Sequence, residues 1–173
     1  MLIYVTGGSG SGKSAYAESC VTESGLEKRI YLATMPAGSG GDSEKRIARH
    51  RQQRAGKGFV TVERQTGLSG LAVPPGCALL LEDLTNLFAN EYFAVGKEGA
   101  EQRVLSGLEA LRRQSALTVV VGNELCCDGM EYDGETAAYL IALSSLSAAV
   151  AEQADQVVEV VCGIPIFWKG GGT

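Results

Sequence analysis

Short apolar runs alternate along the chain with longer stretches that mix apolar and polar residues. The runs are rich in Val, Leu and Ile, and several are apolar at every position, which is the pattern of a strand covered on both faces. They predict strands at Leu2–Thr6, Arg29–Thr34, Phe59–Glu63, Cys77–Leu81, Leu117–Gly122 and Gln156–Val161.

The stretches between these runs have the spacing and length of helices. They predict helices at about 13–24, 43–56, 84–95, 98–115 and 135–154. Strands that alternate with helices build a parallel sheet with helices on both faces. A last apolar segment, Ile164–Lys169, is expected to return as an edge strand, because Pro165 lacks the N–H that a central strand needs. The pattern therefore predicts a doubly wound, mostly parallel α/β domain.

The chain has 173 residues, 45% of them hydrophobic, which is enough for a single domain with its own core. We expect this domain to cover residues 1–169 and the glycine-rich tail, 170–173, to be disordered. No uninterrupted apolar run reaches the about 18 residues of a membrane span, and the N-terminus lacks the features of a signal peptide, so we expect a cytoplasmic protein without a membrane span.

The net charge of −5 argues against nucleic-acid binding. The five cysteines are interpreted as free thiols, and Cys126 and Cys127 are either a reactive pair or two small residues in a turn.

The most specific motif follows the first predicted strand. Residues 7–14 match the phosphate-binding pattern G-x-x-x-x-G-K-[ST], and a predicted helix follows directly. In such a loop the backbone N–H groups and the helix N-terminus point at phosphate oxygens. Lys13 would reach the outer phosphates, and the Ser14 hydroxyl would take one Mg²⁺ position. We expect the whole loop to bind a nucleoside triphosphate through Gly7, Gly8, Ser9, Gly10, Ser11, Gly12, Lys13 and Ser14.

Two further predicted strands end in polar residues. Glu82 and Asp83 follow one of them, and in phosphate-loop enzymes an acid at such a strand end orients the magnesium ion or its water shell. Successive strand residues face opposite ways, so one of the two acids is expected to take this role. Asn123 and Glu124 follow a later strand, and the carboxyl ends of strands in an open parallel sheet line the ligand crevice. These two residues either face the nucleotide or the acceptor, or form a simple turn.

The only histidine lies in a predicted basic helix. Arg46 and Arg54 lie four residues before and after His50, so the three share a helix face. The flanking positive charges favour the neutral, nucleophilic imidazole, and the arginines could hold a phosphate chain against it. The residues alone leave two interpretations. His50 either attacks phosphorus and forms a transient phosphoramidate, or stands incidentally on a solvated basic face.

Nearly end to end, the chain resembles the bifunctional adenosylcobinamide kinase / adenosylcobinamide-phosphate guanylyltransferase family of cobalamin biosynthesis. The resemblance rests on the phosphate loop, on residues 46–54 (RIARHRQQR), which are similar to the family's R-I-x-x-H-R-x-x-R, and on Asn123–Glu124 and Gly163–Pro165. It implies a RecA-like P-loop fold and two reactions. The first phosphorylates adenosylcobinamide with ATP or GTP, and the second transfers GMP from GTP to adenosylcobinamide phosphate. The resemblance also implies a homotrimer.

The resemblance gives roles to residues as well. His50 would carry GMP in a covalent intermediate, and Lys13 would be the second catalytic residue. Glu63 and Glu82 would contact the nucleotide, and Ser14 and Glu82 would hold Mg²⁺. Four arginines would neutralise the triphosphate, namely Arg46, Arg49, Arg51 and Arg54. Two alternatives remain: another P-loop small-molecule kinase in which His50 is idle, and a nucleotide-dependent binding module, although no N-K-x-D motif of an ordinary GTPase switch is present.

Overall fold

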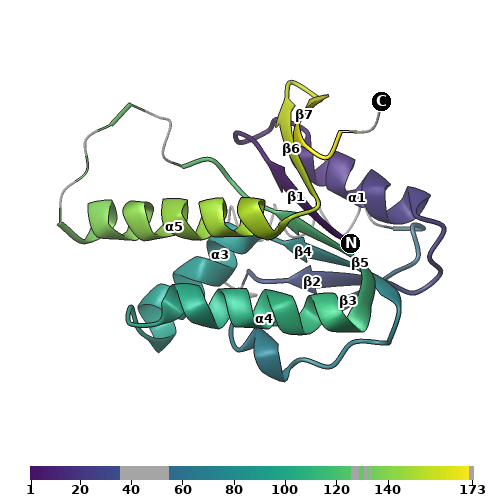
Figure 1. The fold of residues 1–173 in the computed structure, drawn as a ribbon, viewed down its shortest axis with the longest axis horizontal. Coiled ribbons are helices and arrows are strands. Elements are labelled where there is room, and N and C mark those ends of the chain that lie inside the picture. Colours follow the sequence, from purple (N-terminus) through teal and green to yellow (C-terminus); the bar gives the residue numbers. More distant parts are fainter. Residues whose placement is uncertain (36–54, 126–128, 131, 133, 172–173) are drawn as a thin grey trace.

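A computed structural model describes residues 1–35, 55–125, 129–130, 132 and 134–171. A seven-stranded sheet in the order β3-β2-β4-β5-β1-β6-β7 forms its centre (Figure 1). The strands are β1 (Leu2–Thr6), β2 (Arg29–Ala33), β3 (Phe59–Glu63), β4 (Cys77–Glu82), β5 (Ser115–Val121), β6 (Gln156–Val161) and β7 (Ile164–Lys169). The predicted strands are therefore all present, with ends that differ by at most two residues.

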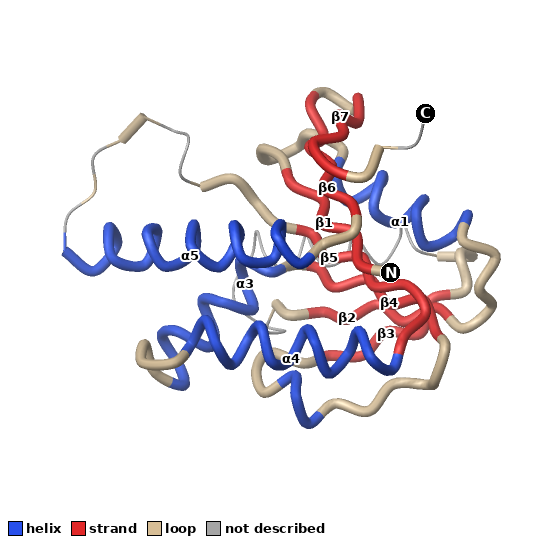
Figure 2. The backbone as a smooth tube through the Cα atoms, in the orientation of Figure 1, coloured by secondary structure: helices blue, strands red, loops and turns tan. Residues whose placement is uncertain are grey.

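Every neighbouring pair of strands is parallel except β6 and β7, which form an antiparallel hairpin. The hairpin turns through Cys162 and Gly163, with φ values of 50° and 81°, and positive φ at both central residues is typical of tight hairpin turns. Pro165 lies in the edge strand, as predicted, where its missing N–H costs no central hydrogen bond. Figure 2 shows this hairpin extending beyond the helices at the top of the molecule.

Helices cover both faces of the sheet. They are α1 (Lys13–Glu23), the 3₁₀ turn η1 (Leu68–Gly70), α3 (Leu84–Ala89), the π-helix η2 (Asn90–Val95), α4 (Ala100–Gln114) and α5 (Gly134–Gln153). The single helix predicted over 84–95 is thus an α-helix that continues as a π-helix. The helix predicted at 43–56 lies outside the described residues up to position 54.

The core consists of two apolar layers, one on each face of the sheet. Val5 of β1 belongs to the layer under α1, together with Ala17 and Val21 of that helix. Tyr4, the preceding residue, belongs to the layer under α3, α4 and α5 (Figure 1). All six residues of β4 are buried, as expected for a central strand covered on both sides. The doubly wound prediction is confirmed by this arrangement.

The last helix, α5, is more apolar than we expected. It has 20 residues and a mean hydropathy of 1.3 over its most apolar part, so by length and composition it is able to cross a membrane. The helix contains no uninterrupted apolar run of about 18 residues, because Ser144, Ser145 and Ser147 interrupt it, so the expected absence of a membrane span stays a prediction. The buried residues of α5 are Tyr139, Leu143, Leu146 and Val150, whereas Ile141 is 73% exposed. Core helices of globular proteins meet the same criterion, so it does not by itself assign a membrane span.

Candidate active site

The predicted phosphate loop runs from the end of β1 into the first turn of α1. Gly7 has a φ of 147°, and a Cβ atom there would lie 2.5 Å from the carbonyl oxygen of Val160. Gly12 has a φ of 96°, and its Cβ would lie 3.2 Å from the Cα of Gly163. The N–H of Gly163 donates to the carbonyl of Ser11 at 2.7 Å. Glycine at positions 7 and 12 therefore allows the loop to pack against the β6–β7 hairpin.

Lys13 lies inside this loop. It is 6% exposed, and its Nζ donates to the carbonyl oxygen of Gly8 at 2.9 Å. The helix α1 starts at the same residue, with Gly12 as N-cap and no side chain that caps its first N–H groups. These N–H groups and the positive end of the helix dipole therefore face the loop. This combination of exposed N–H groups and helix dipole is typical of phosphate-binding sites.

Ser14, the residue after Lys13, lies in a cluster of side-chain oxygens. Ser14 Oγ donates to Oε1 of Glu82 at 2.5 Å, and the Tyr31 hydroxyl donates to Oε2 at 3.2 Å. Hydroxyl and carboxylate oxygens beside a phosphate site are the ligands that Mg²⁺ prefers. In the described part of the chain, no group of three or more His, Cys, Asp and Glu side chains is placed to hold a metal ion. The pair thus fits a cation whose other ligands are phosphate oxygens and water.

Asp83, the other acid at the end of β4, is engaged elsewhere. Its Oδ1 accepts the backbone N–H of Asn86 at 2.7 Å and caps α3. Its Oδ2 accepts from the side-chain amides of Asn86, at 3.0 Å, and Asn123, at 2.9 Å. The structure therefore brings Ser14 together with Glu82, and places the carboxylate of Asp83 against α3 and the end of β5.

Glu63, the second predicted nucleotide contact among the acids, lies level with Glu82 at the carboxyl edge of the sheet. Ala33 of β2 pairs with Glu63 on one side and with Glu82 on the other. Two strand spacings of about 4.8 Å separate the backbones of the two acids by about 10 Å. The two acids thus share one edge of the sheet, on either side of β2.

Several predicted residues lie outside the described part of the chain. They are His50, Arg46, Arg49, Arg51 and Arg54, together with the cysteine pair Cys126 and Cys127. Their roles therefore stay predictions.

The described residues next to the His50 segment are held close to the site. Before it, the Thr34 hydroxyl donates to the carbonyl of Asp83 at 2.9 Å and accepts the N–H of Asp83 at 2.8 Å. After it, Nζ of Lys57 contacts Oε2 of Glu18 at 2.5 Å. Glu18 lies four residues after Ser14, which is about 6 Å along α1. The described residues on either side of the segment therefore contact β4 and α1, which contribute Glu82 and Ser14.

Sequence reasoning missed Tyr31, Thr34 and Asn86, which support Glu82 and Asp83. Tyr31 stands in an apolar strand and is 4% exposed. A buried tyrosine hydroxyl needs a hydrogen-bond partner, so a tyrosine in a strand predicted to be central was an available signal. The choice of that partner depended on strand order, which the sequence pattern did not give.

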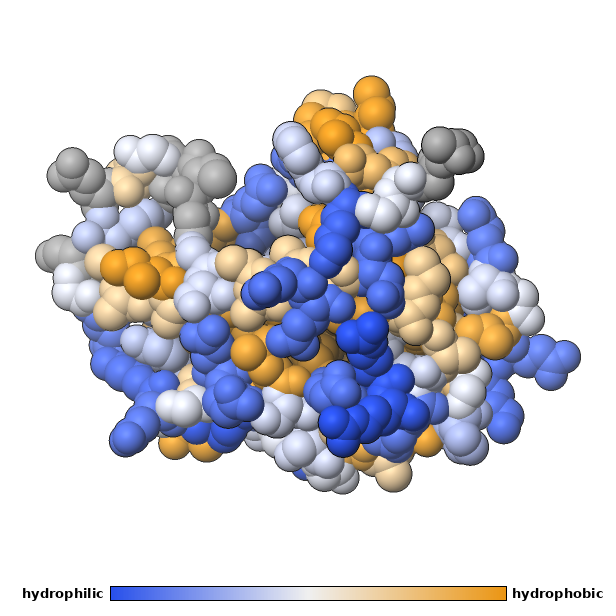
Figure 3. Space-filling view, viewed as in Figure 1, coloured by the Kyte–Doolittle hydropathy of each residue, from blue (hydrophilic) through white to orange (hydrophobic). Residues whose placement is uncertain are grey.

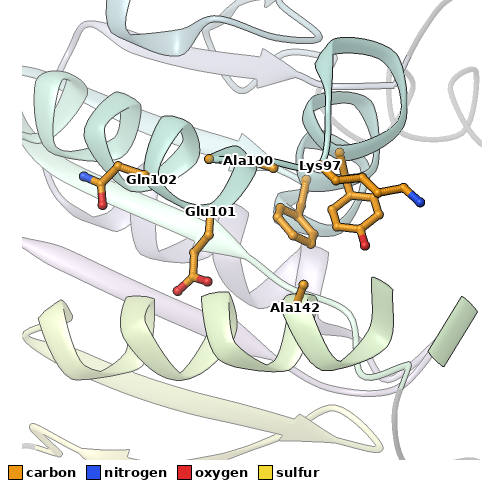
Figure 4. Close-up of a pocket in the computed structure, with 8 residues that line it drawn as sticks. Lys97, Ala100, Glu101, Gln102 and Ala142 are labelled. Carbon is orange, nitrogen blue, oxygen red and sulfur yellow. The ribbon is translucent and has the colours of Figure 1, made fainter. Parts of the chain in front are cut away.

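A cavity of about 320 Å³ lies away from this site, between η2, α4 and α5. Figure 4 shows Glu101, at the start of α4, directed toward α5, which carries Ala142, while Lys97 extends away from Glu101. The charged groups there already have partners: Lys97 pairs with Glu135 at 2.6 Å, and Glu101 accepts from Ser145 at 3.2 Å. None of the lining residues belongs to the phosphate loop or to the end of β4, and we assign no ligand to this cavity.

Comparison with known proteins gives a match over almost the whole chain. The model of a family described as cobinamide kinase / cobinamide phosphate guanyltransferase matches residues 3–167. The chain is 30% identical over 169 residues to the bifunctional adenosylcobalamin biosynthesis protein CobP of Pseudomonas aeruginosa, and the match covers 96% of each chain. It is 29% identical over 186 residues to the bifunctional adenosylcobalamin biosynthesis protein CobU of Salmonella typhimurium, over 98% of this chain and 100% of that protein.

Solved structures of low sequence identity share the fold. An ATPase from the type III secretion system of pathogenic bacteria has a TM-score of 0.58 and 10% identity, over 91% of this chain and 50% of that chain. A protein of Pyrococcus horikoshii OT3 has a TM-score of 0.53 and 12% identity, over 99% and 87% of the two chains. In this chain β5 separates the phosphate-loop strand β1 from the acid-bearing strand β4. The predicted RecA-like P-loop fold is confirmed.

Proposed function

The chain belongs to the cobinamide kinase / cobinamide phosphate guanyltransferase family, and from this premise we propose which of its residues carry each reaction. The enzyme acts in cobalamin biosynthesis, where it phosphorylates cobinamide and transfers a guanylyl group to cobinamide phosphate. The observation that carries the residue assignment is the 2.5 Å contact between Ser14 and Glu82. This contact lies beside the phosphate loop, in which Nζ of Lys13 donates to the carbonyl of Gly8.

For the kinase reaction we assign the outer phosphates of ATP or GTP to Lys13 and the loop, and Mg²⁺ to Ser14 and Glu82. Bound Mg²⁺ neutralises charge on the phosphate oxygens. The Lys13 ammonium stabilises the charge that develops on the transferred phosphoryl group, which is where preorganised positive charge contributes most to the rate. The Tyr31 hydroxyl orients the Glu82 carboxylate by holding its second oxygen.

For the guanylyl reaction we assign His50 as the nucleophile. An imidazole nitrogen attacks the α-phosphorus of GTP, and pyrophosphate leaves with the electron pair of the broken P–O bond. An oxygen of cobinamide phosphate then displaces the imidazole and forms the diphosphate link. The positions of Thr34 and Lys57 support this assignment, because these described residues flank the sequence that carries His50 and contact Asp83 and Glu18, near the phosphate loop. Glu63 and four arginines complete the proposed nucleotide contacts, the latter being Arg46, Arg49, Arg51 and Arg54.

We further propose that the enzyme is a cytoplasmic homotrimer. Support for self-association comes from the edge strand β7, where Ile164, Phe167 and Trp168 are 65%, 47% and 69% exposed. Figure 3 shows this apolar surface over the β6–β7 hairpin at the top of the molecule. Contiguous exposed apolar side chains are typical of protein contact sites. Light scattering of the purified protein tests the trimer, and a monomeric mass contradicts it.

The residue assignment is tested by assaying cobinamide phosphorylation with GTP and Mg²⁺. Lys13→Ala should lower turnover by on the order of 100-fold, since it removes one stabiliser of the transition state. Lys28→Ala, which removes an exposed lysine outside the loop, is the matched control and should keep wild-type turnover. Near-normal turnover of Lys13→Ala would mean that the loop is structural only.

A further inference from the structure

We propose that Glu124 is the general base of the kinase reaction and accepts the proton of the acceptor hydroxyl as that oxygen attacks the γ-phosphorus. This inference rests on the proposed function, because it requires an alcohol acceptor at the phosphate loop. It adds a catalytic residue that neither the loop motif nor the metal site supplies.

The position of Glu124 in the sheet is the first argument. It follows β5, which lies between β4, the strand that ends in Glu82, and β1, the strand that leads into the phosphate loop. At the end of β5, the N–H of Gly122 donates to the carbonyl of Val5 at 2.8 Å. Neighbouring strands are about 4.8 Å apart, so the chain leaves β5 between the metal-site acid and the phosphates.

The backbone around Glu124 is fixed from both sides. On the β4 side, the Asn123 N–H donates to Thr85 Oγ1 at 3.1 Å, and the Asn123 amide donates to Asp83 Oδ2 at 2.9 Å. On the β1 side, the N–H of Glu124 donates to the carbonyl of Gly7, the first glycine of the phosphate loop, at 3.4 Å. The backbone that carries Glu124 therefore needs little reorganisation when substrate binds.

The contact between Gly122 and Tyr4 of β1 also places Glu124 near that strand. A Cβ atom on Gly122 would lie 2.3 Å from the hydroxyl of Tyr4, so the chain passes directly over that phenol. Burial raises the pKa of Tyr4, and the negative charges of Glu124 and Asp83 act in the same direction. The carboxylate of Glu124 is therefore close enough to the Tyr4 hydroxyl for its charge to act on that group.

The carboxylate itself is available, unlike those of the neighbouring acids. Glu124 is exposed, and its carboxylate oxygens accept no hydrogen bond and form no ion pair with any residue that the structure describes. Glu82 is bonded to Ser14, and Asp83 accepts three N–H donors. Glu63 lies on β3, two strands beyond β4 on the side away from the loop. Of these four acids, all among the described residues, Glu124 is the one beside the loop whose oxygens are open to a substrate hydroxyl.

The chemistry balances without another reactant. The acceptor oxygen forms a bond to the γ-phosphorus while the bond from that phosphorus to the β–γ bridging oxygen breaks, and the nucleoside diphosphate leaves with the electron pair. The hydroxyl proton passes to the Glu124 carboxylate and from there to water. General bases of this kind contribute roughly 100-fold to 10,000-fold to rate.

The test is steady-state kinetics of Glu124→Gln on cobinamide with GTP and Mg²⁺. We expect kcat to fall about 100-fold, with unchanged KM for GTP, unchanged half-saturating Mg²⁺ and unchanged incorporation of GMP into the protein. Glu152→Gln, an exposed glutamate at the far end of α5, is the matched control and should keep kcat.

Wild-type kcat in Glu124→Gln would overturn the inference. A raised Mg²⁺ requirement would overturn it as well, since it would make Glu124 a metal-site residue. Failure of the wild-type chain to phosphorylate cobinamide would instead refute the proposed function, so the two failures are distinguishable.

Discussion

Replacing Glu82 by glutamine separates a metal-binding role from a structural one at the end of β4. Glutamine keeps the shape of the side chain beside Ser14, at 2.5 Å, and Tyr31, at 3.2 Å, but removes the negative charge. We therefore expect Glu82→Gln to fold and to bind Mg²⁺ more weakly.

The size of this effect follows from the charge that is lost. Two unit charges 4 Å apart interact by about 4 kcal/mol at an effective dielectric constant of 20, and desolvation of the ions offsets much of this. Loss of a group that orients a bound metal typically lowers metal affinity by about 10-fold to 100-fold. The Mg²⁺ concentration for half-maximal activity should therefore rise by about 10-fold to 100-fold, which corresponds to about 1.4–2.8 kcal/mol.

The neighbouring substitution Asp83→Asn is the matched control. The Asp83 carboxylate accepts three N–H groups, two from Asn86 and one from Asn123, whereas an amide offers one oxygen. At least one donor loses its partner at a side chain that is 2% exposed. We expect a loss of about 1–3 kcal/mol in the free energy of unfolding, with a nearly unchanged Mg²⁺ requirement.

The Mg²⁺ requirement is measured from initial rates of cobinamide phosphorylation against Mg²⁺ concentration at saturating GTP. The free energy of unfolding is measured by denaturant unfolding. The opposite pattern, with the Mg²⁺ shift in Asp83→Asn, would transfer the metal role to Asp83. No shift in either variant would remove the end of β4 from the metal site.

Two further predictions concern stability. Lys57→Met should lower the free energy of unfolding by about 1–3 kcal/mol, because it leaves the Glu18 carboxylate, which is 2% exposed, without its cation. This loss is smaller than that expected for a fully buried ion pair, since the Lys57 side chain is 39% exposed. Adding Glu18→Gln should recover most of the loss in denaturant unfolding, and no recovery would refute the explanation. The Leu2 N–H donates to the Asp155 carboxylate at 2.6 Å, and this hydrogen bond, together with the charge of Arg112, holds the pKa of Asp155 below its usual value. The ionised carboxylate therefore stabilises the folded protein at neutral pH, and this stabilisation is lost as the pH falls through the lowered pKa. The melting temperature of Asp155→Asn should therefore be lower than that of the wild type at about pH 7, and the difference should shrink as the pH falls below the usual range of a carboxyl group; a difference that stays constant in acid would contradict this.

Most of the fold could be predicted from the sequence because burial imposes simple patterns. The strand β4 is buried at every position and reads as one apolar run, and Pro165 marks β7 as an edge strand. The π-helix over Asn90–Val95 could not be predicted, because a helix that widens by one residue per turn keeps a similar apolar pattern. The start of β5 at Ser115 was missed because a register shift opposite Cys77 extends the strand into polar sequence.

The site was predictable where a local motif or a strand end defines it. The loop spacing identified Lys13 and Ser14, and the acid at the end of β4 placed Glu82 near them across a separation of 68 residues. Pleating alone left Glu82 and Asp83 as alternatives. The hydrogen bonds of Asn86 and Asn123 to Asp83 are the observation that favours Glu82 in our proposal, and these bonds depend on the three-dimensional arrangement of α3 and β5.

The most direct test of the central claim, guanylyl transfer through a covalent intermediate on this chain, is the intact mass of the purified protein after incubation with GTP and Mg²⁺. We predict a gain of one GMP per chain that is lost in acid and kept in base, as expected of a phosphoramidate, and no gain in His50→Ala. An unmodified wild-type protein would contradict the claim, and a His50→Ala variant that still takes up GMP would contradict the assignment of His50.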